Sequence, residues 1–270
     1  MPELPEVETS KRGIYPYCLN QKIKTIEVRN SRLRWPVNED ISEKMSGQTI
    51  IEIVRRGKYL LLITESNSLM IHLGMSGSLR ICEATRPVEK HDHVDIELQN
   101  GKIIRYNDPR RFGCVMLNPD KLNHKLLIKL GVEPLESEFS AEYLYKACKS
   151  SNQPIKSLIM NSQIVVGVGN IYAQESLFRS KIKPTRKANG LSRKMVADLV
   201  NSIKQILSQA IEAGGSSLKD FTSAEGKPGY FQQTLDVYGR SGQPCKQCGK
   251  ELKKIIIAQR ATVFCSSCQK

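Results

Sequence analysis

Four cysteines near the end of the chain have the residue type and the spacing of a metal site. They form two Cys-x2-Cys pairs, Cys245 with Cys248 and Cys265 with Cys268, and sixteen residues separate the pairs. Four thiolates at this spacing can surround one Zn²⁺ ion in a tetrahedron. Two disulfide bonds are the alternative, but the acidic, proline-interrupted start of the chain is unlike a secretory signal. We therefore predict one structural Zn²⁺ ion held by these four cysteines.

The other four cysteines predict no site. Each stands alone among apolar residues, at Cys18, Cys82, Cys114 and Cys148. In a reduced cytosolic protein such cysteines are usually small buried core residues. No apolar run approaches the roughly 20 residues of a membrane-spanning helix, so we expect a cytoplasmic protein.

The charge of the chain indicates a polyanionic partner. Its 270 residues include 41 Lys and Arg against 27 Asp and Glu, which gives a formal net charge of +14. Residues 1–136 carry +3 of this charge and residues 137–270 carry +11. A charge that served only solubility would be spread more evenly, whereas a surface that lies on a phosphate backbone accounts for the asymmetry.

The hydrophobic pattern predicts a first domain made mainly of β-strands. A short helix over 7–15, ended by Gly13 and Pro16, precedes it. Short runs rich in Val, Ile and Leu then predict strands over 23–28, 59–64, 69–73, 94–98 and 102–106. Asn100-Gly101, between the last two runs, predicts a type I′ hairpin turn. Strands without long helices between them favour a sandwich or a barrel.

The pattern changes to helices near residue 135, which predicts a second domain. Helices are expected over 141–149, after Pro154, over 170–181 and in a long segment from Ser192, where apolar residues recur at i, i+3 and i+4.

Between the cysteine pairs, β-rich segments over 252–258 and 262–265 flank Gln259-Arg260-Ala261. The cysteine module should therefore be a hairpin whose turn displays Arg260, either as a solvated residue or as a probe for phosphate.

Motifs along the whole chain resemble the formamidopyrimidine-DNA glycosylase family. The first are Pro-Glu-Leu-Pro-Glu-Val-Glu-Thr at 2–9 and Gly-Lys-Tyr-Leu-Leu at 57–61. The others are, in chain order, His-Leu-Gly-Met-Ser-Gly at 72–77, Lys-His-Asp-His-Val at 90–94, Asn-Asp-Pro-Arg-Arg-Phe-Gly at 107–113, Val-Gly-Asn-Ile-Tyr-Ala at 168–173, Gly-Lys-Pro-Gly-Tyr-Phe at 226–231, Val-Tyr-Gly-Arg at 237–240 and Ala-Gln-Arg-Ala-Thr at 258–262. Each motif is weak alone, but their occurrence together and in this order is specific.

The resemblance implies an α+β multidomain fold. Its parts are an N-terminal catalytic β-sandwich domain with a short N-terminal helix over 1–134, a helix-two-turn-helix DNA-binding domain over 135–225, a linker over 226–235 and a C-terminal four-cysteine zinc-finger β-hairpin over 236–270. The implied activity is that of a DNA repair enzyme, a DNA-formamidopyrimidine glycosylase that is also an abasic-site lyase. It would flip oxidised purines, chiefly 8-oxoguanine and formamidopyrimidines, out of duplex DNA, excise them and cleave the strand by β,δ-elimination. We expect a monomer that associates with the nucleoid.

The resemblance assigns the chemistry to Pro2, Glu3, Lys58 and Arg260. Removal of Met1 would expose Pro2 as a secondary amine, and an α-amino pKa of about 7.7 to 8.0 leaves a useful neutral fraction at pH 7. This amine is expected to form a Schiff base with C1′ of the damaged nucleotide. Glu3 matches the general acid that acts on the sugar ring. Lys58 matches the residue for β-elimination, and Arg260 the residue for δ-elimination and phosphate binding.

Further residues match the family's DNA contacts. A flipped base leaves a void in the duplex, and Met75, Arg110 and Phe112 match the trio that fills it. The expected phosphate or strand contacts are His72, His91, Arg111, Asn170, Tyr238 and Lys254. Lys156, Lys219 and the loop over 217–230 resemble the part of the family that covers the flipped base.

Two other functions stay open on the sequence. The endonuclease VIII branch shares the Pro-Glu start and the zinc finger but prefers oxidised pyrimidines, and Leu4 with Arg110-Arg111-Phe112 argues against it. A non-catalytic zinc-ribbon DNA-binding protein would also explain the basic second half, but it gives Pro2, Glu3 and Lys58 no role. Competition between oxidised purine and oxidised pyrimidine substrates distinguishes the endonuclease VIII branch from the formamidopyrimidine-DNA glycosylases. Substitution of Pro2, Glu3 or Lys58 distinguishes an enzyme from a protein that only binds DNA.

Overall fold

A computed structural model describes residues 2–215 and 235–270 of the chain. These residues divide into two compact units, one formed by residues 2–128 and 213–215 and the other by residues 129–212 and 235–270. The predicted linker over 226–235 and the loop over 217–230 therefore lie almost wholly outside the described residues, and Lys219 lies outside them too. Within the described part of the chain, none of the helices has the length and apolar character that crossing a membrane requires.

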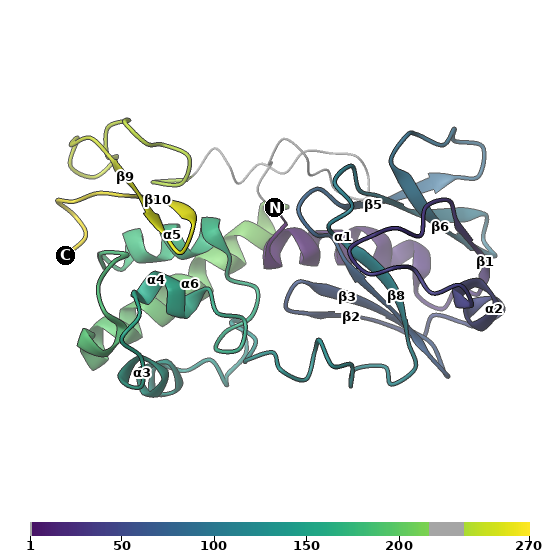
Figure 1. The fold of residues 1–270 in the computed structure, drawn as a ribbon, viewed down its shortest axis with the longest axis horizontal. Coiled ribbons are helices and arrows are strands. Elements are labelled where there is room, and N and C mark those ends of the chain that lie inside the picture. The colour runs from purple at the N-terminus through teal and green to yellow at the C-terminus, as the bar shows by residue number, and fades with distance from the viewer. Residues whose placement is uncertain (1, 216–234) are drawn as a thin grey trace. The chain divides into compact units, whose positions relative to one another are not determined.

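Two antiparallel four-stranded sheets form the body of the first unit (Figure 1). One sheet has the order β1 (Ile23–Val28), β6 (Asp92–Leu98), β7 (Lys102–Asn107) and β5 (Ser78–Glu83). The other has the order β2 (Glu52–Arg56), β3 (Tyr59–Ile63), β4 (Ser68–His72) and β8 (Cys114–Asn118). The strands predicted from the apolar runs are present, so the prediction of a β-sandwich is confirmed.

The core of the sandwich follows from the alternation of side chains along each strand. Leu60 and Leu62 of β3 point into one cluster with Ile71 of β4 and Ile96 of β6. Leu61, which lies between them in sequence, is also fully buried but belongs to the opposite face. Each such side chain stabilises the fold by about 1.5 to 3 kcal/mol on burial.

Helix α1 (Leu4–Cys18) is longer than predicted, because it continues through Gly13 and Pro16. A proline inside a helix removes one backbone donor, but Pro16 is exposed and lies in the last turn, where that cost is smallest. Ile14 and Cys18 are fully buried in the core of the sandwich, so tertiary packing holds the last turn in place. The predicted end of the helix at Gly13 and Pro16 was therefore wrong.

The connection from β6 to β7 also differs from its prediction. The backbone N–H of Gly101 donates to the carbonyl oxygen of Leu98 at 3.1 Å, and Gly101 alone of the three loop residues has a positive φ, of 80°. This is the three-residue loop in which glycine takes the left-handed position after a turn, rather than a two-residue type I′ turn. The hairpin was predicted correctly, and its turn type was not.

The second unit contains the predicted helices. They are α3 (Ala141–Lys149), α4 (Ile155–Ile159), α5 (Asn170–Arg179) and α6 (Arg193–Glu212), with a short 3₁₀ turn η1 (Ala188–Gly190). Helix α5 is the central element, since its residues from Ile171 to Phe178 are all buried, whereas α6 buries one face. The hairpin of β9 (Lys253–Ile257) and β10 (Arg260–Phe264) packs on α5 through β10 (Figure 1).

The end of the chain is bound to the loop that follows α5. Lys183 donates its backbone N–H to the carbonyl oxygen of Lys270, and Lys270 donates to that of Lys181, both at 3.0 Å. The buried amide of Gln269 donates to the carbonyl oxygen of Ile182 at 2.9 Å. These bonds, with the packing of β10 on α5, make the cysteine module part of the helical unit.

The first unit also contains a short helix, α2 (Ile41–Met45), which packs on β1.

Candidate functional site

Pro2 and Glu3 lie at the buried start of helix α1. Glu3 is the N-cap and is only 1% exposed, and it forms a reciprocal capping box with Glu6. In this box the backbone N–H of Glu3 donates to Oε2 of Glu6 at 2.8 Å. Pro2 is buried immediately before the cap. The backbone at the start of the chain is therefore held in one conformation, which a reactive group there would need.

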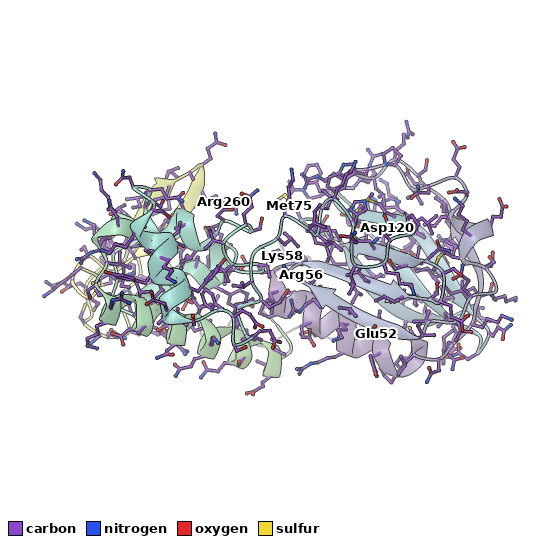
Figure 2. All side chains as sticks on the ribbon, turned by 90° about the horizontal axis from the view of Figure 1, so that it is seen from below. Glu52, Arg56, Lys58, Met75, Asp120 and Arg260 are labelled. Carbon is purple, nitrogen blue, oxygen red and sulfur yellow. The ribbon has the colours of Figure 1, made fainter. Side chains whose placement is uncertain are left out.

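The hairpin that carries Lys58 is tied to the same helix. Gly57, with φ of 58°, and Lys58 form the two-residue turn between β2 and β3 (Figure 2). The guanidinium of Arg55 donates to Oε2 of Glu8 on α1 at 2.9 Å and to the carbonyl oxygen of Gly57 at 3.1 Å. Arg55 thus fixes the turn that carries Lys58 relative to the helix that carries Pro2 and Glu3.

His72 is a neutral hydrogen-bonding residue at the end of β4. Its Nδ1 accepts the backbone N–H of Gly74 at 2.9 Å, and its ring packs against that of Tyr59 with 4.8 Å between centroids. Burial, reinforced by the charges of Lys58 and Arg34, lowers the pKa of His72 to about 4. The bond at Nδ1 requires that the proton of the neutral ring is on Nε2, so His72 can donate a hydrogen bond to a ligand but brings no charge.

Two loops of the first unit present exposed apolar side chains. Met75 is 36% exposed and Phe112 is 45% exposed, and the guanidinium of Arg110 lies 4.9 Å from the centre of the Phe112 ring. Arg111, which lies between Arg110 and Phe112 in sequence, has a left-handed φ of 57°. A cavity of about 540 Å³ lies beside these loops and is lined by Arg34, His72, Gly74, Met75, Arg111 and Phe112.

The two loops touch through their glycines. A Cβ on Gly74 would lie 2.4 Å from the backbone nitrogen of Gly113, and a Cβ on Gly113 would lie 2.3 Å from the carbonyl oxygen of His72. Only glycine allows this approach of two backbones. The structure therefore brings together Met75, Arg110 and Phe112, the residues predicted as one trio from separate motifs.

The tip of the hairpin in the second unit is strained. Ala258 and Gln259 form its turn, with left-handed φ values of 46° and 60°. Residues other than glycine rarely adopt this left-handed backbone conformation, because it costs roughly 1 to 2 kcal/mol per residue. Arg260 is exposed and begins β10, paired with Ile257. It therefore stands beside the turn, whereas the sequence had predicted it within the turn.

Lys156 does not stand where a DNA contact was expected. Its ammonium group is buried and donates to Oδ1 of Asn170 and to Oγ1 of Thr262, both at 2.6 Å. Asn170 in turn donates to the carbonyl oxygen of Ala261 at 3.2 Å. The prediction of a direct contact to the nucleic acid conflicts with this burial, because the charge of Lys156 is used to join α4, α5 and the hairpin.

The segment that contains Tyr238 is held by Glu175 of α5. Its carboxylate accepts the backbone N–H groups of Asp236, Val237 and Tyr238 at 2.8 to 2.9 Å. Burial raises the pKa of Glu175, and the three donors oppose that shift. Of the other predicted contacts, Lys254 is exposed on β9 and His91 is partly exposed just before β6.

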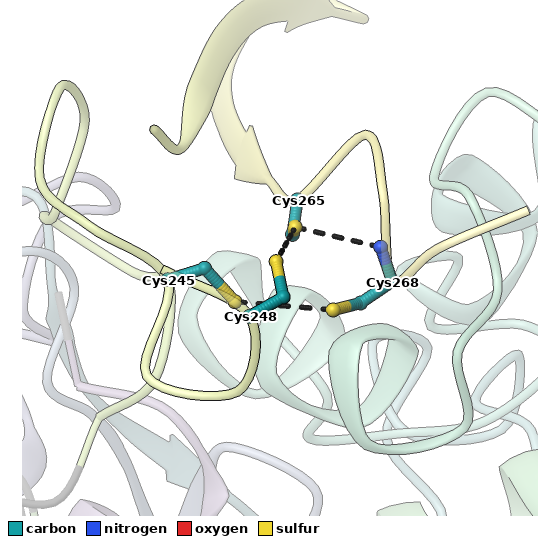
Figure 3. Close-up of side chains that lie close together, drawn as sticks. All are labelled: Cys245, Cys248, Cys265 and Cys268. Atoms are coloured by element: carbon teal, nitrogen blue, oxygen red, sulfur yellow. Dashed lines mark hydrogen bonds between the residues drawn. The ribbon is translucent and has the colours of Figure 1, made fainter. Parts of the chain in front are cut away.

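The four predicted zinc ligands converge in the second unit (Figure 3). Their sulfur atoms lie within 4.8 Å of one another, with 4.0 Å between those of Cys245 and Cys268 and 3.5 Å between those of Cys248 and Cys265. A tetrahedron with Zn–S bonds of about 2.3 Å has S–S edges of roughly 3.8 Å. The donor set therefore fits one Zn²⁺ ion. Cys245 and Cys265 also belong to a buried cluster with Phe178 of α5, Leu252 and Val263.

Several positioning residues could not be recognised from the sequence. Arg55, Gln174, Glu175 and Asp108 have buried or half-buried side chains that hold backbone groups of the candidate site. Their partners are distant along the chain or are backbone atoms, which leave no pattern of residue types. Gln174, for example, accepts the backbone N–H of Val263 at 2.6 Å and donates to the carbonyl oxygen of Ala261 at 3.2 Å.

Comparison with known proteins defines the class as DNA glycosylases built from a sandwich, a helical domain and a zinc finger. Family models match residues 1–115 (formamidopyrimidine-DNA glycosylase N-terminal domain), 130–222 (formamidopyrimidine-DNA glycosylase H2TH domain) and 242–270 (zinc finger found in FPG and IleRS). The formamidopyrimidine-DNA glycosylases of Pseudomonas entomophila and Photobacterium profundum are 52% and 53% identical to this chain. Each comparison spans 270 residues and covers 100% of this chain and 100% of the relative.

Solved structures agree with the sequence comparison. The Fpg protein of Thermus thermophilus has a TM-score of 0.89 at 36% identity and covers 99% of this chain and 98% of its own. The Lactococcus lactis Fpg, solved with DNA that contains an abasic site, has a TM-score of 0.91 at 37% identity and covers 99% of each chain. This chain belongs to the formamidopyrimidine-DNA glycosylase family, whose members are DNA glycosylases with abasic-site lyase activity, and its cofactor is one zinc ion.

The first test concerns the neutral ring of His72. Because its folded pKa of about 4 lies below the unfolded value of 6.5, the unfolded chain binds more protons between these values. The free energy of unfolding should therefore fall as the pH falls from about 6.5 to about 4. His72→Asn keeps an acceptor near the position of Nδ1 and removes the titration, so urea unfolding at pH 5 and pH 7 should differ less in the variant. Equal pH slopes in the two proteins would contradict the buried neutral ring.

A second test concerns the zinc ligands. Cys248→Ser should lower the zinc content from one ion per chain to near zero, because four thiolates are needed for a structural site of this kind. Amide hydrogen exchange should then accelerate in β10 while β3 keeps its protection, since β3 lies in the other unit. Cys82→Ser, at a buried cysteine of the sandwich, is the matched control and should keep one zinc ion. Full zinc content in Cys248→Ser would rule out this ligand set.

Proposed function

We propose that the chain excises oxidised purines, chiefly 8-oxoguanine and formamidopyrimidines, from duplex DNA and then cleaves the abasic strand by β,δ-elimination. The observation that carries this proposal is the capped, buried start of α1 with Pro2 and Glu3, joined through Arg55 to the turn that contains Lys58. A protein that only binds DNA has no need for such a terminus. Neighbouring structures add support, since Lactococcus lactis Fpg has been solved with abasic-site DNA and a mutant of it with DNA that contains Fapy-dG.

The first step is attack by the Pro2 nitrogen on C1′. Removal of Met1 would free this secondary amine, and the positive end of α1 favours its neutral form. As the N–C1′ bond forms, the bond from C1′ to the base breaks and its electron pair leaves with the base, which takes up a proton. Glu3 supplies a proton to the ring oxygen of the sugar as the ring opens, and an iminium ion joins Pro2 to C1′.

The iminium ion makes strand cleavage possible. It acidifies the C2′ proton, whose removal expels the 3′ phosphate; removal of the C4′ proton from the conjugated product then expels the 5′ phosphate. Lys58, on its fixed turn, is the proposed acid and base of the first elimination. Arg260, exposed beside the hairpin turn, is the proposed phosphate-binding residue of the second.

DNA binding is assigned to groups of both units. In the first unit, Met75, Arg110 and Phe112 are proposed to fill the void that a flipped base leaves, and His72, His91 and Arg111 to contact the strand or its phosphates. In the second unit, the start of α5 at Asn170 offers the positive end of a helix. Tyr238, in the segment that Glu175 holds, and Lys254, exposed on β9 of the hairpin, are the other proposed contacts. Lys156 contributes indirectly, since it holds Asn170 and Thr262.

The mechanism is tested by borohydride trapping on a duplex with one 8-oxoguanine opposite cytosine. Reduction should give a covalent adduct that maps by mass spectrometry to Pro2, because only an iminium ion is trapped in this way. Glu3→Gln should lower the rate of base excision by about a hundredfold or more, since it removes a general acid. The side-chain carbonyl oxygen of the glutamine can still accept the backbone N–H of Glu6 and close the capping box, so duplex binding should persist.

Either of two results would contradict this mechanism. Tight binding of the duplex by a chain shown to lack Met1, without an adduct, would favour the non-catalytic zinc-ribbon protein. Preferred excision of an oxidised pyrimidine in direct competition would favour the endonuclease VIII branch.

The role of Arg260 is tested by the salt dependence of duplex binding. Arg260→Ala should weaken binding and reduce the slope of log K against log salt by about one unit, because one phosphate contact releases about one counterion. His72→Asn is the matched control. Its ring is neutral, so its loss should weaken binding without a change of slope. An unchanged slope in Arg260→Ala would remove Arg260 from the phosphate contacts.

A further inference from the structure

The carboxylate of Asp108 lies between the two loops that carry Met75 and Phe112. Asp108 is 0% exposed, and each of its oxygens accepts two hydrogen bonds. Oδ1 accepts the hydroxyl of Ser76 at 2.7 Å and the backbone N–H of Arg110 at 3.3 Å. Oδ2 accepts the backbone N–H of Gly113 at 2.9 Å and the hydroxyl of Tyr106 at 3.2 Å. One side chain therefore binds residues of both loops and the end of β7.

The backbone of Asp108 extends this connection. Its N–H donates to the carbonyl oxygen of His91 at 3.0 Å, and its carbonyl oxygen accepts the N–H of Arg111 at 3.2 Å. The same carbonyl oxygen lies 2.8 Å from Nε2 of the buried His93. A third segment, which contains His91, is thus attached to the same residue.

The side chains that these loops present are exposed and apolar or cationic. Met75 follows Gly74 and precedes Ser76, Phe112 precedes Gly113, and Arg110 stacks on Phe112. Two of the bonds to Asp108 therefore lie one residue from an exposed apolar side chain. Ser76 reinforces the arrangement, because its hydroxyl oxygen also accepts the backbone N–H of Arg110 at 3.2 Å.

We propose that Asp108 is a positioning residue that holds Met75, Arg110 and Phe112 as one preformed wedge for insertion into the DNA stack. The inference rests on the proposed function, since a wedge is useful only to a protein that opens a duplex. Opening the stack costs a few kcal/mol, and loops that had to be ordered during insertion would add to that cost. A buried carboxylate suits this task because it only accepts hydrogen bonds, and its four partners here all donate.

The experiment compares Asp108→Asn with the wild type on duplexes that carry 8-oxoguanine opposite cytosine or opposite adenine. The variant replaces one acceptor oxygen with an amide nitrogen, so one pair of donors loses its acceptor. The ratio of kcat/KM for cytosine over adenine depends on Arg110 facing the orphaned base, and it should fall about tenfold, as expected for a lost charge-assisted hydrogen bond. Cleavage of an abasic site in a single strand needs no wedge and should stay within about twofold of the wild-type rate.

A double-variant cycle separates positioning from general damage. If Asp108 acts through Arg110, adding Asp108→Asn to Arg110→Ala should not lower the ratio further, whereas multiplicative losses would overturn the proposal. Asp95→Asn is the matched control, since it alters a similarly buried carboxylate of the same unit whose partners are Arg29 and Arg105. An equal loss of the ratio in Asp95→Asn, or an unchanged ratio in Asp108→Asn, would also overturn it.

Two further measurements keep the outcome decisive. Should Asp108→Asn fail to fold, Ser76→Ala removes the 2.7 Å bond to Asp108 and the 3.2 Å bond from the backbone N–H of Arg110, but it leaves the other three bonds to the Asp108 carboxylate in place. It should therefore lower the ratio by a smaller factor, and an unchanged ratio there would contradict the proposal. Borohydride trapping of the wild type on the same duplex comes first. Absence of that adduct would overturn the proposed function, whereas an adduct with an unchanged ratio would overturn only the role of Asp108.

Discussion

The packing of helix α1 onto the β-sandwich is the interaction on which the proposed chemistry depends. The first residues of a domain are usually poorly ordered, which suits a nucleophile badly. Here Leu4, Val7 and Ile14 are buried, and the capping box of Glu3 and Glu6 closes the first turn. Because α1 packs against β2 and β5, one strand from each sheet, the sandwich itself orders the start of the chain. Arg55 then extends the same order to the turn of Lys58.

A second anchoring system operates in the helical unit. Zinc closes one end of the hairpin module, and Lys156, Asn170 and Gln174 bind the other end near the strained turn. The burial of a lysine ammonium is costly unless its donors are used, and two oxygens at 2.6 Å accept two of its three N–H groups. The metal and these polar contacts together hold Arg260 in place on a module too small to have a core of its own.

The first unit uses a buried and a half-buried polar residue in the same way. Asp108 binds the loops of Met75 and Phe112, and His72 binds the backbone that follows β4 without carrying charge. Preorganised groups of this kind lower the cost of opening a duplex, because less ordering is left for the moment of binding. The exposed side chains of Arg110 and Phe112 are proposed to contact the DNA, and the buried Asp108 decides where they stand.

The residue types and spacing by themselves determined the zinc ligands, the helices of the second unit and five strands of the first, because each depends on local periodicity or on a short motif. Strands β2, β5 and β8 and helix α2 were not predicted. The roles proposed for Pro2 and Glu3 came only from the family resemblance. Residue patterns also identified the trio of Met75, Arg110 and Phe112 through a family resemblance. Only the tertiary structure decided that α1 passes through Pro16, that Lys156 is buried, and that Asp108 and Arg55 act as connectors. The physical reason is that such roles depend on packing and on bonds to backbone groups far along the chain, which no local pattern of side chains records.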